Sequence, residues 1–219
     1  MSYIRHADLG GRSGYGAVKP EPEGELFHAP WQARAMALTV AMGATGAWNI
    51  DQTRSARETL PNYADLSYYE IWVAALEVLL RERELVLAPE VAAGHALVPA
   101  RPLPGILTGA RVAEVLARGA PTERSSTAPP RFAVGQSVRT RRADPPHHWR
   151  LPGYAQGKRG QIERAHGMHV FADTNSQGLG EQAQWLYTVV FDGGELWNDA
   201  PAAHIKVSVD AWESYLERA

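Results

Sequence analysis

The segment from His147 to Trp197 constrains the fold most, because it strings short β-type runs between glycine turns. Alternating apolar runs bounded by Gly, Pro and Asn are typical of strands that tight turns connect. From about residue 132 onward the candidate runs are Ser137–Arg141, Gly160–Ala165, His169–Ala172, Leu186–Phe191 and Ile205–Val209. Five short strands in roughly 90 residues predict a small closed barrel of the SH3-like type over residues 132–219.

The first part of the chain has the hydrophobic period of α-helices instead. Between Pro30 and about Leu85, apolar residues recur every three or four positions, which predicts amphipathic helices. A second helix is expected to begin near Asn49 or Asp51, because either side chain can cap it. The first helix carries its apolar stripe at Trp31, Ala35, Leu38 and Met42.

A third helix is expected over about Ser67 to Arg83. A further short helix is expected around Pro104–Arg118, where Gly119 can end it. The apolar stripe of the third helix is formed by Ile71, Ala75, Val78 and Leu79. These helices predict an all-α domain over residues 29–120, so the whole chain is expected to have an α+β fold with the helical domain before the barrel.

Glycine and proline mark two irregular segments of the chain. Residues 1–28 are interrupted by Gly10, Gly11, Gly14, Gly16, Pro20 and Pro22. We expect them to form an extended arm that either wraps a neighbour or stays a loose tail. Residues 121–131 have the Pro-, Ser- and Ala-rich composition of a linker. The predicted order is therefore arm, helical domain, linker and barrel.

The composition of the 219 residues narrows the function classes. The net charge of −2 gives no reason to expect nucleic acid or an acidic membrane as a partner. No apolar run approaches the roughly 20 residues that span a bilayer, and the first residues lack the apolar region of a signal peptide. We therefore expect a cytoplasmic protein. The chain has no cysteine, which excludes disulfides, thiolate metal sites and cysteine nucleophiles within it.

Two histidine pairs invite interpretation as a metal site: His147–His148, and His166 with His169. A metal site needs three or four convergent ligands with supporting carboxylates, and no Asp or Glu follows either pair at a matching spacing. We therefore expect a structural or surface role for both pairs and no metal ligand in this chain. The glycines at 178 and 180 predict a turn, because no Lys-Ser/Thr follows them as in a phosphate loop.

The residue types draw attention to two arginines and one aromatic helix face, but they do not indicate a reaction. Arg54 would most often be a solvated helix residue. Arg150 would also most often be a solvated residue, but neighbours such as Trp149 favour a packed loop around it. Tyr68 and Trp72 share one helix face, where core packing is the usual role of aromatic residues.

A series of short motifs extends over nearly the full length of the chain. In the N-terminal half they are Asp8–Gly11, Gly14 with Gly16, Phe27–Ala29 with Trp31, Asn49–Arg54, Tyr63 and Ser67–Glu70. In the C-terminal half they are Phe132–Gly135, Arg150–Tyr154, Gly157–Gly160, Asp173–Thr174, Gly178–Glu181, Leu186–Val189, Glu195–Trp197 and Trp212–Leu216. In this order the motifs resemble the β subunit of nitrile hydratase.

The resemblance implies a lyase that adds water to a nitrile and yields an amide. In that family the α subunit holds a non-corrin Co(III) or a non-haem Fe(III) through cysteine sulfurs and two backbone amides. Two of these cysteines are oxidised, to sulfenic and sulfinic acid. The implied partner is therefore an α subunit, in an αβ heterodimer or an (αβ)2 heterotetramer. Cobalt is preferred over iron because Trp72 stands in place of a tyrosine.

The resemblance also implies site residues. By motif, Arg54 and Arg150 correspond to the two arginines that hydrogen-bond the oxidised cysteine oxygens of the α subunit. Tyr68 corresponds to the active-site tyrosine, which orients a catalytic group of the partner or passes a proton to the developing imidate. The residues implied to line the substrate pocket are Trp72, Trp48, Ile50, Thr53 and Tyr69.

Three alternatives stay open for the sequence alone. A non-enzymatic activator of the same family would resemble the N-terminal half and lack the complete barrel with Arg150. A thiocyanate hydrolase would carry the β-like sequence split between two chains. A generic SH3-like interaction module would give Arg54 and Tyr68 no role.

Overall fold

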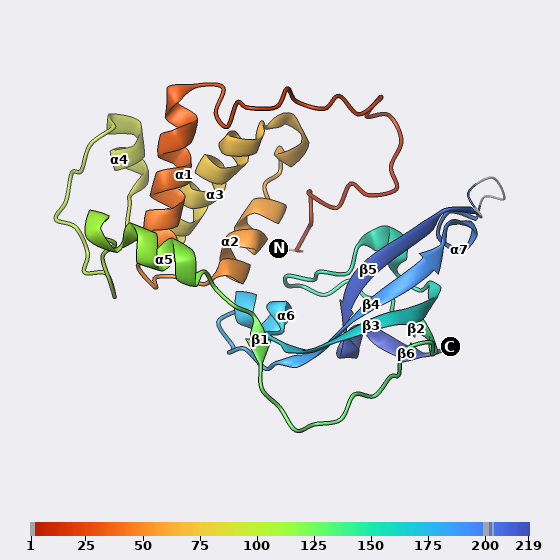
Figure 1. Cartoon of the computed structure of the whole chain (residues 1–219). Helices are drawn as coiled ribbons and strands as arrows, with labels where there is room; N and C mark the ends of the chain where they lie inside the picture. The colour runs from red at the N-terminus through yellow and green to blue at the C-terminus, as the bar shows by residue number, and fades with distance from the viewer. Residues whose placement is uncertain (1–2, 199–201, 203) are drawn as a thin grey trace. The chain divides into compact units, whose positions relative to one another are not determined.

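The helices of the N-terminal half begin where the sequence offers a proline or a cap. The computed structural model describes residues 3–198, 202 and 204–219. In Figure 1, the three long helices are α1 (Pro30–Gly43), α2 (Ile50–Glu58) and α3 (Tyr68–Glu82). Pro30 starts α1, where its missing N–H costs nothing. The three helices expected from the hydrophobic period are confirmed. None of the described helices is long and apolar enough to cross a bilayer.

The shorter helical elements depart further from the sequence prediction. They are the 3-10 helix η1 (Tyr63–Asp65), α4 (Ala88–Ala93), the 3-10 helix η2 (Gly109–Arg111) and α5 (Val112–Arg118). The sequence did not predict α4, which ends at Gly94 in the left-handed conformation (φ 69°). The helix expected around Pro104–Arg118 begins only at Gly109, because Pro104 and Gly105 both disfavour helix.

Two compact units make up the chain, and each is described by itself. The helical unit comprises Ile4–Ala7 and Tyr15–Ala120, and the sheet unit comprises Met1–Tyr3, Asp8–Gly14 and Pro121–Ala219. The segment expected to form an arm is therefore divided. The Ala7 N–H donates to the Glu58 carbonyl at 3.2 Å, whereas the Asp8 carboxylate accepts the Gly153 N–H at 2.9 Å. The limits predicted for arm, linker and domains stay predictions.

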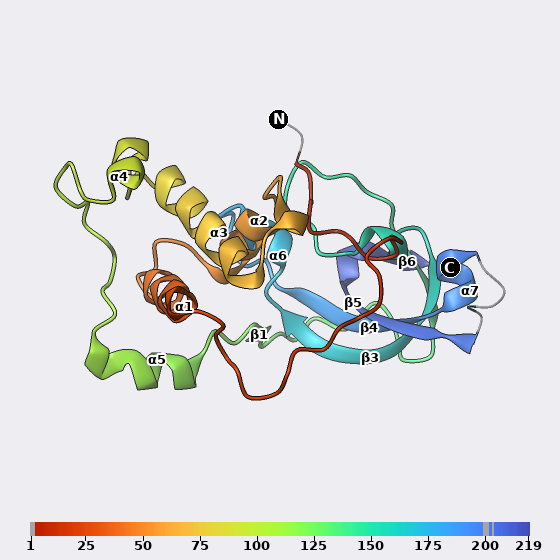
Figure 2. The ribbon, with the colours of Figure 1, turned by 90° about the horizontal axis from the view of Figure 1, so that it is seen from above.

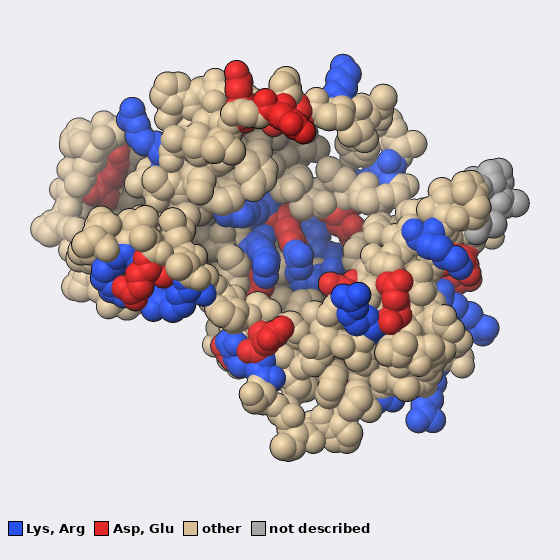
Figure 3. Space-filling view, viewed as in Figure 1, with Lys and Arg blue, Asp and Glu red and all other residues tan. Residues whose placement is uncertain are grey.

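A small apolar core holds the helical unit together between α2 and α3. Its buried members are Trp48, Ala56, Leu60, Ala75, Leu76 and Leu79. The apolar stripe expected on α3 is confirmed, since Ala75 and Leu79 are buried while Ile71 and Val78 pack partly buried against the same cluster. On the surface, basic and acidic residues lie together over α5 (Figure 3), because Arg111 and Arg118 both pair with Glu114.

The stripe expected on α1 is only partly right. Trp31 and Leu38 are 42% and 57% exposed, although the period assigned them to the core. Ala35 of the stripe is buried and Met42 packs partly buried against the core, but the other buried residues of α1 are the polar Gln32 and Thr39. The Thr39 hydroxyl donates to the Ala35 carbonyl at 2.9 Å, so its burial leaves no hydrogen-bonding group unsatisfied. Small and locally satisfied residues let α1 pack against α3.

The sheet unit is one antiparallel sheet in the order β5-β4-β3-β2-β6, with β1 paired to β3 (Figure 1). Figure 2 shows β3, β4 and β5 side by side. The strands of the sheet are β1 (Glu123–Arg124), β2 (Ser137–Thr140), β3 (Arg159–His169), β4 (Gln184–Asp192), β5 (Lys206–Trp212) and β6 (Leu216–Arg218). Short helical elements lie between them: η3 (Gly153–Ala155), α6 (Ala172–Ser176), α7 (Gly193–Trp197) and η5 (Glu213–Tyr215). With the helical unit, this gives the α+β class that the sequence predicts.

The described residues do not close the sheet. Strands β5 and β6 stand at the two ends of the strand order, and no pairing in the described part of the chain joins them. Closure as an SH3-like barrel therefore stays a prediction.

The strands differ most from the sequence prediction at Gly167. The sequence predicts two strands, Gly160–Ala165 and His169–Ala172, with a turn between them. The structure has one strand, β3, that continues through Gly167 and ends at His169. The strand expected over His169–Ala172 is not formed, since α6 begins at Ala172. The register against β4 shifts between Ala165 and Gly167, where Gly167 has φ 100°. A glycine inside a strand can mark a bulge as well as a turn, so the two-strand prediction was wrong here.

Gly160 provides a test of the β3–β4 packing. A Cβ at this position would lie 2.6 Å from the Val189 side chain and 2.8 Å from the Val190 carbonyl oxygen. That carbonyl belongs to a sheet strand and cannot yield, so Gly160→Ala should lower the free energy of unfolding by about 1–3 kcal/mol. Urea unfolding measures the change. Gly109→Ala is the control, since a Cβ there meets nothing within 4 Å; equal midpoints for the two variants would contradict the prediction.

Candidate functional site

A capping box fixes the start of α2. The Asn49 side chain accepts the N–H groups of Asp51 and Gln52, both at 3.0 Å. In return the Gln52 side-chain oxygen accepts the Asn49 N–H at 2.9 Å. These bonds satisfy donors that a helix start leaves without partners. The cap is therefore Asn49, the first of the two candidates in the sequence, and Arg54 follows it within the next turn.

A buried carboxylate holds Arg54. The Nη1 atom of Arg54 donates to Asp51 Oδ1 at 2.8 Å, and Asp51 is 2% exposed. The Arg54 side chain itself is 41% exposed. A guanidinium carries five N–H donors in a rigid fork, so an ion pair through one nitrogen orients the others. Arg54 is thus not the loosely solvated helix residue that its type alone favours.

An aromatic cluster of Tyr68, Tyr69 and Trp72 forms the start of α3. Its ring centroids lie 5.1 to 5.8 Å apart. Tyr68 is 65% exposed, so its phenol does not have the core role that aromatic residues usually take. The Glu70 carboxylate accepts the Ser67 N–H at 2.8 Å and fixes the helix start. Hydrogen bonds from the Ser67 hydroxyl and N–H hold the pKa of Glu70 below its usual value.

Arg57 joins this cluster, although the sequence did not single it out. Its guanidinium carbon lies 4.0 Å from the centre of the Trp72 ring, which is a cation–π contact. Its Nε is buried and has no hydrogen-bond partner in the described part of the chain. Burial also lowers the pKa of Arg57. The sequence contained one signal for Arg57, which stands three residues after Arg54. Residues at this spacing are neighbours on a helix surface.

The remaining predicted pocket residues lie at different depths. Trp48 is buried within the core of the helical unit. Thr53 is also buried, and its hydroxyl donates to the Asn49 carbonyl at 3.3 Å. Ile50 is exposed at the start of α2. Their roles in a substrate pocket stay predictions.

Arg150 lies in the sheet unit, in the loop before η3. Its side chain is exposed, while Trp149 and Leu151 on either side are buried. The Arg150 N–H donates to the Tyr215 hydroxyl at 3.2 Å, and the Trp149 ring lies 4.0 Å from the Tyr215 ring, centroid to centroid. These contacts confirm the packed loop expected around Arg150. Arg54 and Tyr68 belong to the helical unit, so neither unit by itself contains the whole predicted residue set.

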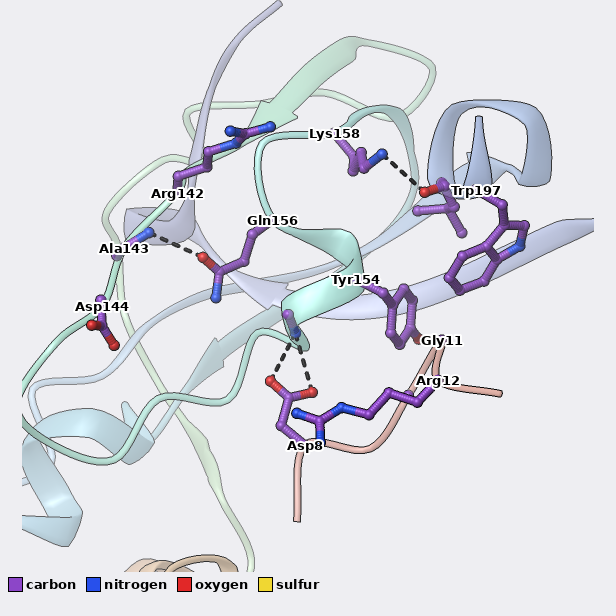
Figure 4. A pocket seen from close by; sticks show the side chains of 13 residues that line it. Asp8, Gly11, Arg12, Arg142, Ala143, Asp144, Tyr154, Gln156, Lys158 and Trp197 are labelled. Carbon is purple, nitrogen blue, oxygen red and sulfur yellow. Dashed lines mark hydrogen bonds between the residues drawn. The ribbon is translucent and has the colours of Figure 1, made fainter. Parts of the chain in front are cut away.

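A pocket of about 1020 Å³ opens in the sheet unit (Figure 4). The rings of Tyr154 and Trp197 lie 5.2 Å apart on its wall. Gly10 and Gly11 pack against them so closely that a Cβ on either glycine would lie 2.7 Å from a ring atom. No predicted site residue lines this pocket. Packing therefore explains why glycine stands at both positions of the Gly10–Gly11 motif, since only glycine permits this close approach to the rings.

Of the four histidines noted in the sequence, His166 and His169 lie on β3, whereas His147 and His148 lie in the loop between β2 and η3. His166 Nε2 is 2.7 Å from the Thr188 hydroxyl oxygen, and His169 Nδ1 is 3.0 Å from the Thr122 hydroxyl oxygen. Across residues 3–198, 202 and 204–219, no three or more His, Asp or Glu side chains form a group that could hold a metal ion.

Two family models together match almost the whole chain. The model of the nitrile hydratase beta subunit, N-terminal, matches residues 4–123, and that of the nitrile hydratase beta subunit, C-terminal, matches residues 121–218. The chain belongs to the nitrile hydratase β-subunit family. Its matched segments include the motifs around Arg54, Tyr68 and Arg150.

Relatives in the nitrile hydratase β-subunit family match over similar lengths. The chain is 36% identical to the nitrile hydratase subunit beta of Pseudomonas putida, over 97% of this chain and 98% of that protein. It is 34% identical to the low-molecular weight cobalt-containing nitrile hydratase subunit beta of Rhodococcus rhodochrous, over 95% and 96%. It is 30% identical to the cobalt-containing nitrile hydratase subunit beta of Pseudonocardia thermophila, over 96% and 94%.

A solved structure of thiocyanate hydrolase from Thiobacillus thioparus, a recombinant apo-enzyme, also matches. It is 28% identical and covers 42% of this chain and 78% of that chain, with a TM-score of 0.39. This similarity is too limited to bear on the fold.

The capping box of α2 predicts the effect of removing Asn49. Asn49→Ala leaves two helix N–H groups without their acceptor, and should lower the free energy of unfolding by about 1 kcal/mol. Thermal unfolding measures the loss. Asn62→Ala is the matched control, because Asn62 stands before η1 without a side-chain cap bond. A control as destabilised as Asn49→Ala would show that the cap contributes nothing specific.

Proposed function

We propose that this chain is the β subunit of a nitrile hydratase, which adds water to a nitrile and yields an amide together with an α subunit. The observation that carries the proposal is the match of both β-subunit family models to consecutive parts of one chain. An activator restricted to the N-terminal half, or a sequence split as in thiocyanate hydrolase, would not give this match. The names of the relatives support the same activity.

The metal would belong to the α subunit. The proposed cofactor is a non-corrin Co(III), or alternatively a non-haem Fe(III), and the names of two relatives favour cobalt. This chain lacks cysteine, and so cannot supply the cysteine sulfurs that the family uses to hold the metal. The bound metal would act as a Lewis acid on the nitrile or on the attacking species. The residues of this chain would act around that centre.

Arg54 and Arg150 would donate hydrogen bonds to the oxidised cysteine oxygens of the α subunit. Sulfur oxyanions buried at an interface need charge-assisted donors, and a guanidinium offers several in a fixed fork. The geometry of each arginine suits this role. Arg54 is oriented by buried Asp51, and Arg150 extends from a loop whose backbone is anchored.

Tyr68 would act in the active site. Its exposed phenol at the start of α3 is available to orient a catalytic group of the α subunit or to pass a proton to the developing imidate. Trp72 and Tyr69, in ring contact with Tyr68, would line the substrate pocket. Ile50, Thr53 and Trp48 would complete the pocket from the start of α2 and the residue before its cap. Arg57 would hold the Trp72 ring in place.

The assembly would be an αβ heterodimer or an (αβ)2 heterotetramer in the cytoplasm. The C-terminal sheet would have the closed SH3-like form, with arm, helical domain, linker and barrel at the limits that the sequence predicts.

Co-purification tests the proposed partner directly. A tagged form of the chain, isolated from its native lysate, should bring down one stoichiometric protein with a Cys-x-x-Cys-Ser-Cys peptide whose cysteines carry added oxygens. Mass spectrometry identifies both features, and cobalt or iron should stay with that partner. The isolated chain is the control and should bind neither metal stoichiometrically. Tight metal binding by the chain alone, or a monomer without this partner, would contradict the proposal.

Conservative substitutions test the two arginines. Lysine keeps the charge and loses the fork, so Arg54→Lys and Arg150→Lys should each leave the α-subunit oxyanions poorly paired. Broken buried ion pairs cost about 3–5 kcal/mol, so kcat of the αβ complex should fall at least about 100-fold. Nitrile hydration measures kcat, and circular dichroism checks the fold. Arg81→Lys, at an exposed pair with Glu77, is the control. Near-normal turnover in either test variant would remove the role from that arginine.

A further inference from the structure

Arg150 is attached to the sheet core by a chain of hydrogen bonds. Its N–H donates to the Tyr215 hydroxyl at 3.2 Å, and that hydroxyl donates to the Asp173 carboxylate. Tyr215 is fully buried in η5, and Asp173 is 2% exposed in α6. We propose that Tyr215 and Asp173 are positioning residues, which fix the backbone of Arg150 and thereby aim its guanidinium. This inference rests on the proposed function of Arg150.

The Tyr215 phenol is well suited to connect the Asp173 carboxylate to the Arg150 N–H. A hydroxyl can donate one hydrogen bond and accept others at the same time. Here the proton goes to Asp173 and a lone pair receives the Arg150 N–H. A hydroxyl that donates to a carboxylate is polarised and becomes a better acceptor. The loop at Arg150 is therefore held by a bond that the carboxylate of Asp173 strengthens.

Ionisation does not interrupt this chain of bonds near neutral pH. Burial, and then the nearby charge of Asp173, raise the pKa of Tyr215 well above its usual value. The hydrogen bond from the Arg150 N–H, and then the nearby charge of Arg150, oppose that rise in pKa only partly. The phenol therefore keeps its proton and its two roles over the pH range in which an enzyme of this kind would work.

Aromatic packing also holds the Tyr215 ring in place. The Trp149 ring contacts Tyr215, and the rings of Phe171 and Trp212 lie 5.9 and 5.8 Å from it. Arg150 is exposed between two buried neighbours, so its side chain points out of the core of the sheet unit. The hydrogen bond to Tyr215 then fixes the backbone position from which the Arg150 side chain extends. Small errors in such a position are costly, since about 1 Å of misplacement can cost about 100-fold in rate.

Tyr187 provides a matched control for Tyr215. It is also fully buried in the sheet unit, and its hydroxyl also donates to a carboxylate, that of Glu213, at 2.6 Å. Burial raises the pKa of Tyr187 as well. The difference is that only the Tyr215 bond continues to Arg150. Replacing either tyrosine by phenylalanine removes one buried hydroxyl, whereas only Tyr215→Phe should affect the Arg150 loop.

The experiment compares variants within the complete αβ complex. Tyr215→Phe and Tyr187→Phe should lower the unfolding midpoint to a similar degree. Tyr215→Phe should lower kcat roughly 10- to 100-fold with little change in KM, because Arg150 would act on the oxidised cysteines of the α subunit and not on the free substrate. Tyr187→Phe should keep kcat within about twofold. The double variant Tyr215→Phe/Arg150→Lys should be no slower than Arg150→Lys alone, since both act through one residue.

The outcomes separate the two proposals. If Arg150→Lys abolishes turnover while Tyr215→Phe and Tyr187→Phe behave alike, the positioning role is overturned and the function of Arg150 stands. If Arg150→Lys has normal turnover, the role of Arg150 fails, and the positioning role fails with it. Metal content per complex shows that each variant is loaded equally.

A second pair of variants covers the case in which Tyr215→Phe does not fold. Asp173→Asn keeps an acceptor oxygen for the Tyr215 hydroxyl, whereas Asp173→Leu has none. We expect Asp173→Asn to retain most of the kcat that Asp173→Leu loses. Equal kcat values in two folded, metal-loaded complexes would overturn the positioning role.

Discussion

The hydroxyl of Tyr215 connects the buried interior of the sheet unit to its exposed Arg150 loop. Without a partner, neither a buried phenol nor a buried carboxylate would be tolerated, because each loses its hydration. The Tyr215 hydroxyl donates to the Asp173 carboxylate, and a lone pair of the phenol oxygen accepts the Arg150 N–H. The aromatic packing around this pair then fixes a loop that would otherwise be a surface segment.

The helical unit uses the same physical device for its own arginine. Asp51 is as deeply buried as Asp173, and its carboxylate binds the guanidinium of Arg54 directly. In the helical unit a buried acid thus holds the side chain of a half-exposed arginine. In the sheet unit a buried acid holds the backbone of an exposed arginine through the Tyr215 hydroxyl. The guanidinium of Arg54 and the backbone of Arg150 are thus both held by contacts within this chain. Such preorganisation reduces the conformational entropy lost on association and favours the proposed recognition of oxyanions on an α subunit.

Local signals predicted most of the elements, and tertiary contacts explain the exceptions. Asn49 and the residues before α3 mark helix starts by a mechanism that acts within a few residues, so these starts were predictable. Gly167 was misread because a glycine permits both a turn and a bulge, and only pairing with β4 decides between them. Leu38 was misread because helical period does not show which face of α1 meets a neighbouring helix.

By itself, the sequence determined the α+β order of elements and the family, and it named two arginines as candidate site residues, since caps, hydrophobic period and motif order are properties of neighbouring residues. Only the tertiary structure decided what holds those arginines and which aromatic residues stay exposed. Tyr215 lies 65 residues from Arg150 and 42 from Asp173, and Arg57 reaches Trp72 from another helix. Contacts over such separations depend on how the elements pack, and no local pattern in one sequence encodes them.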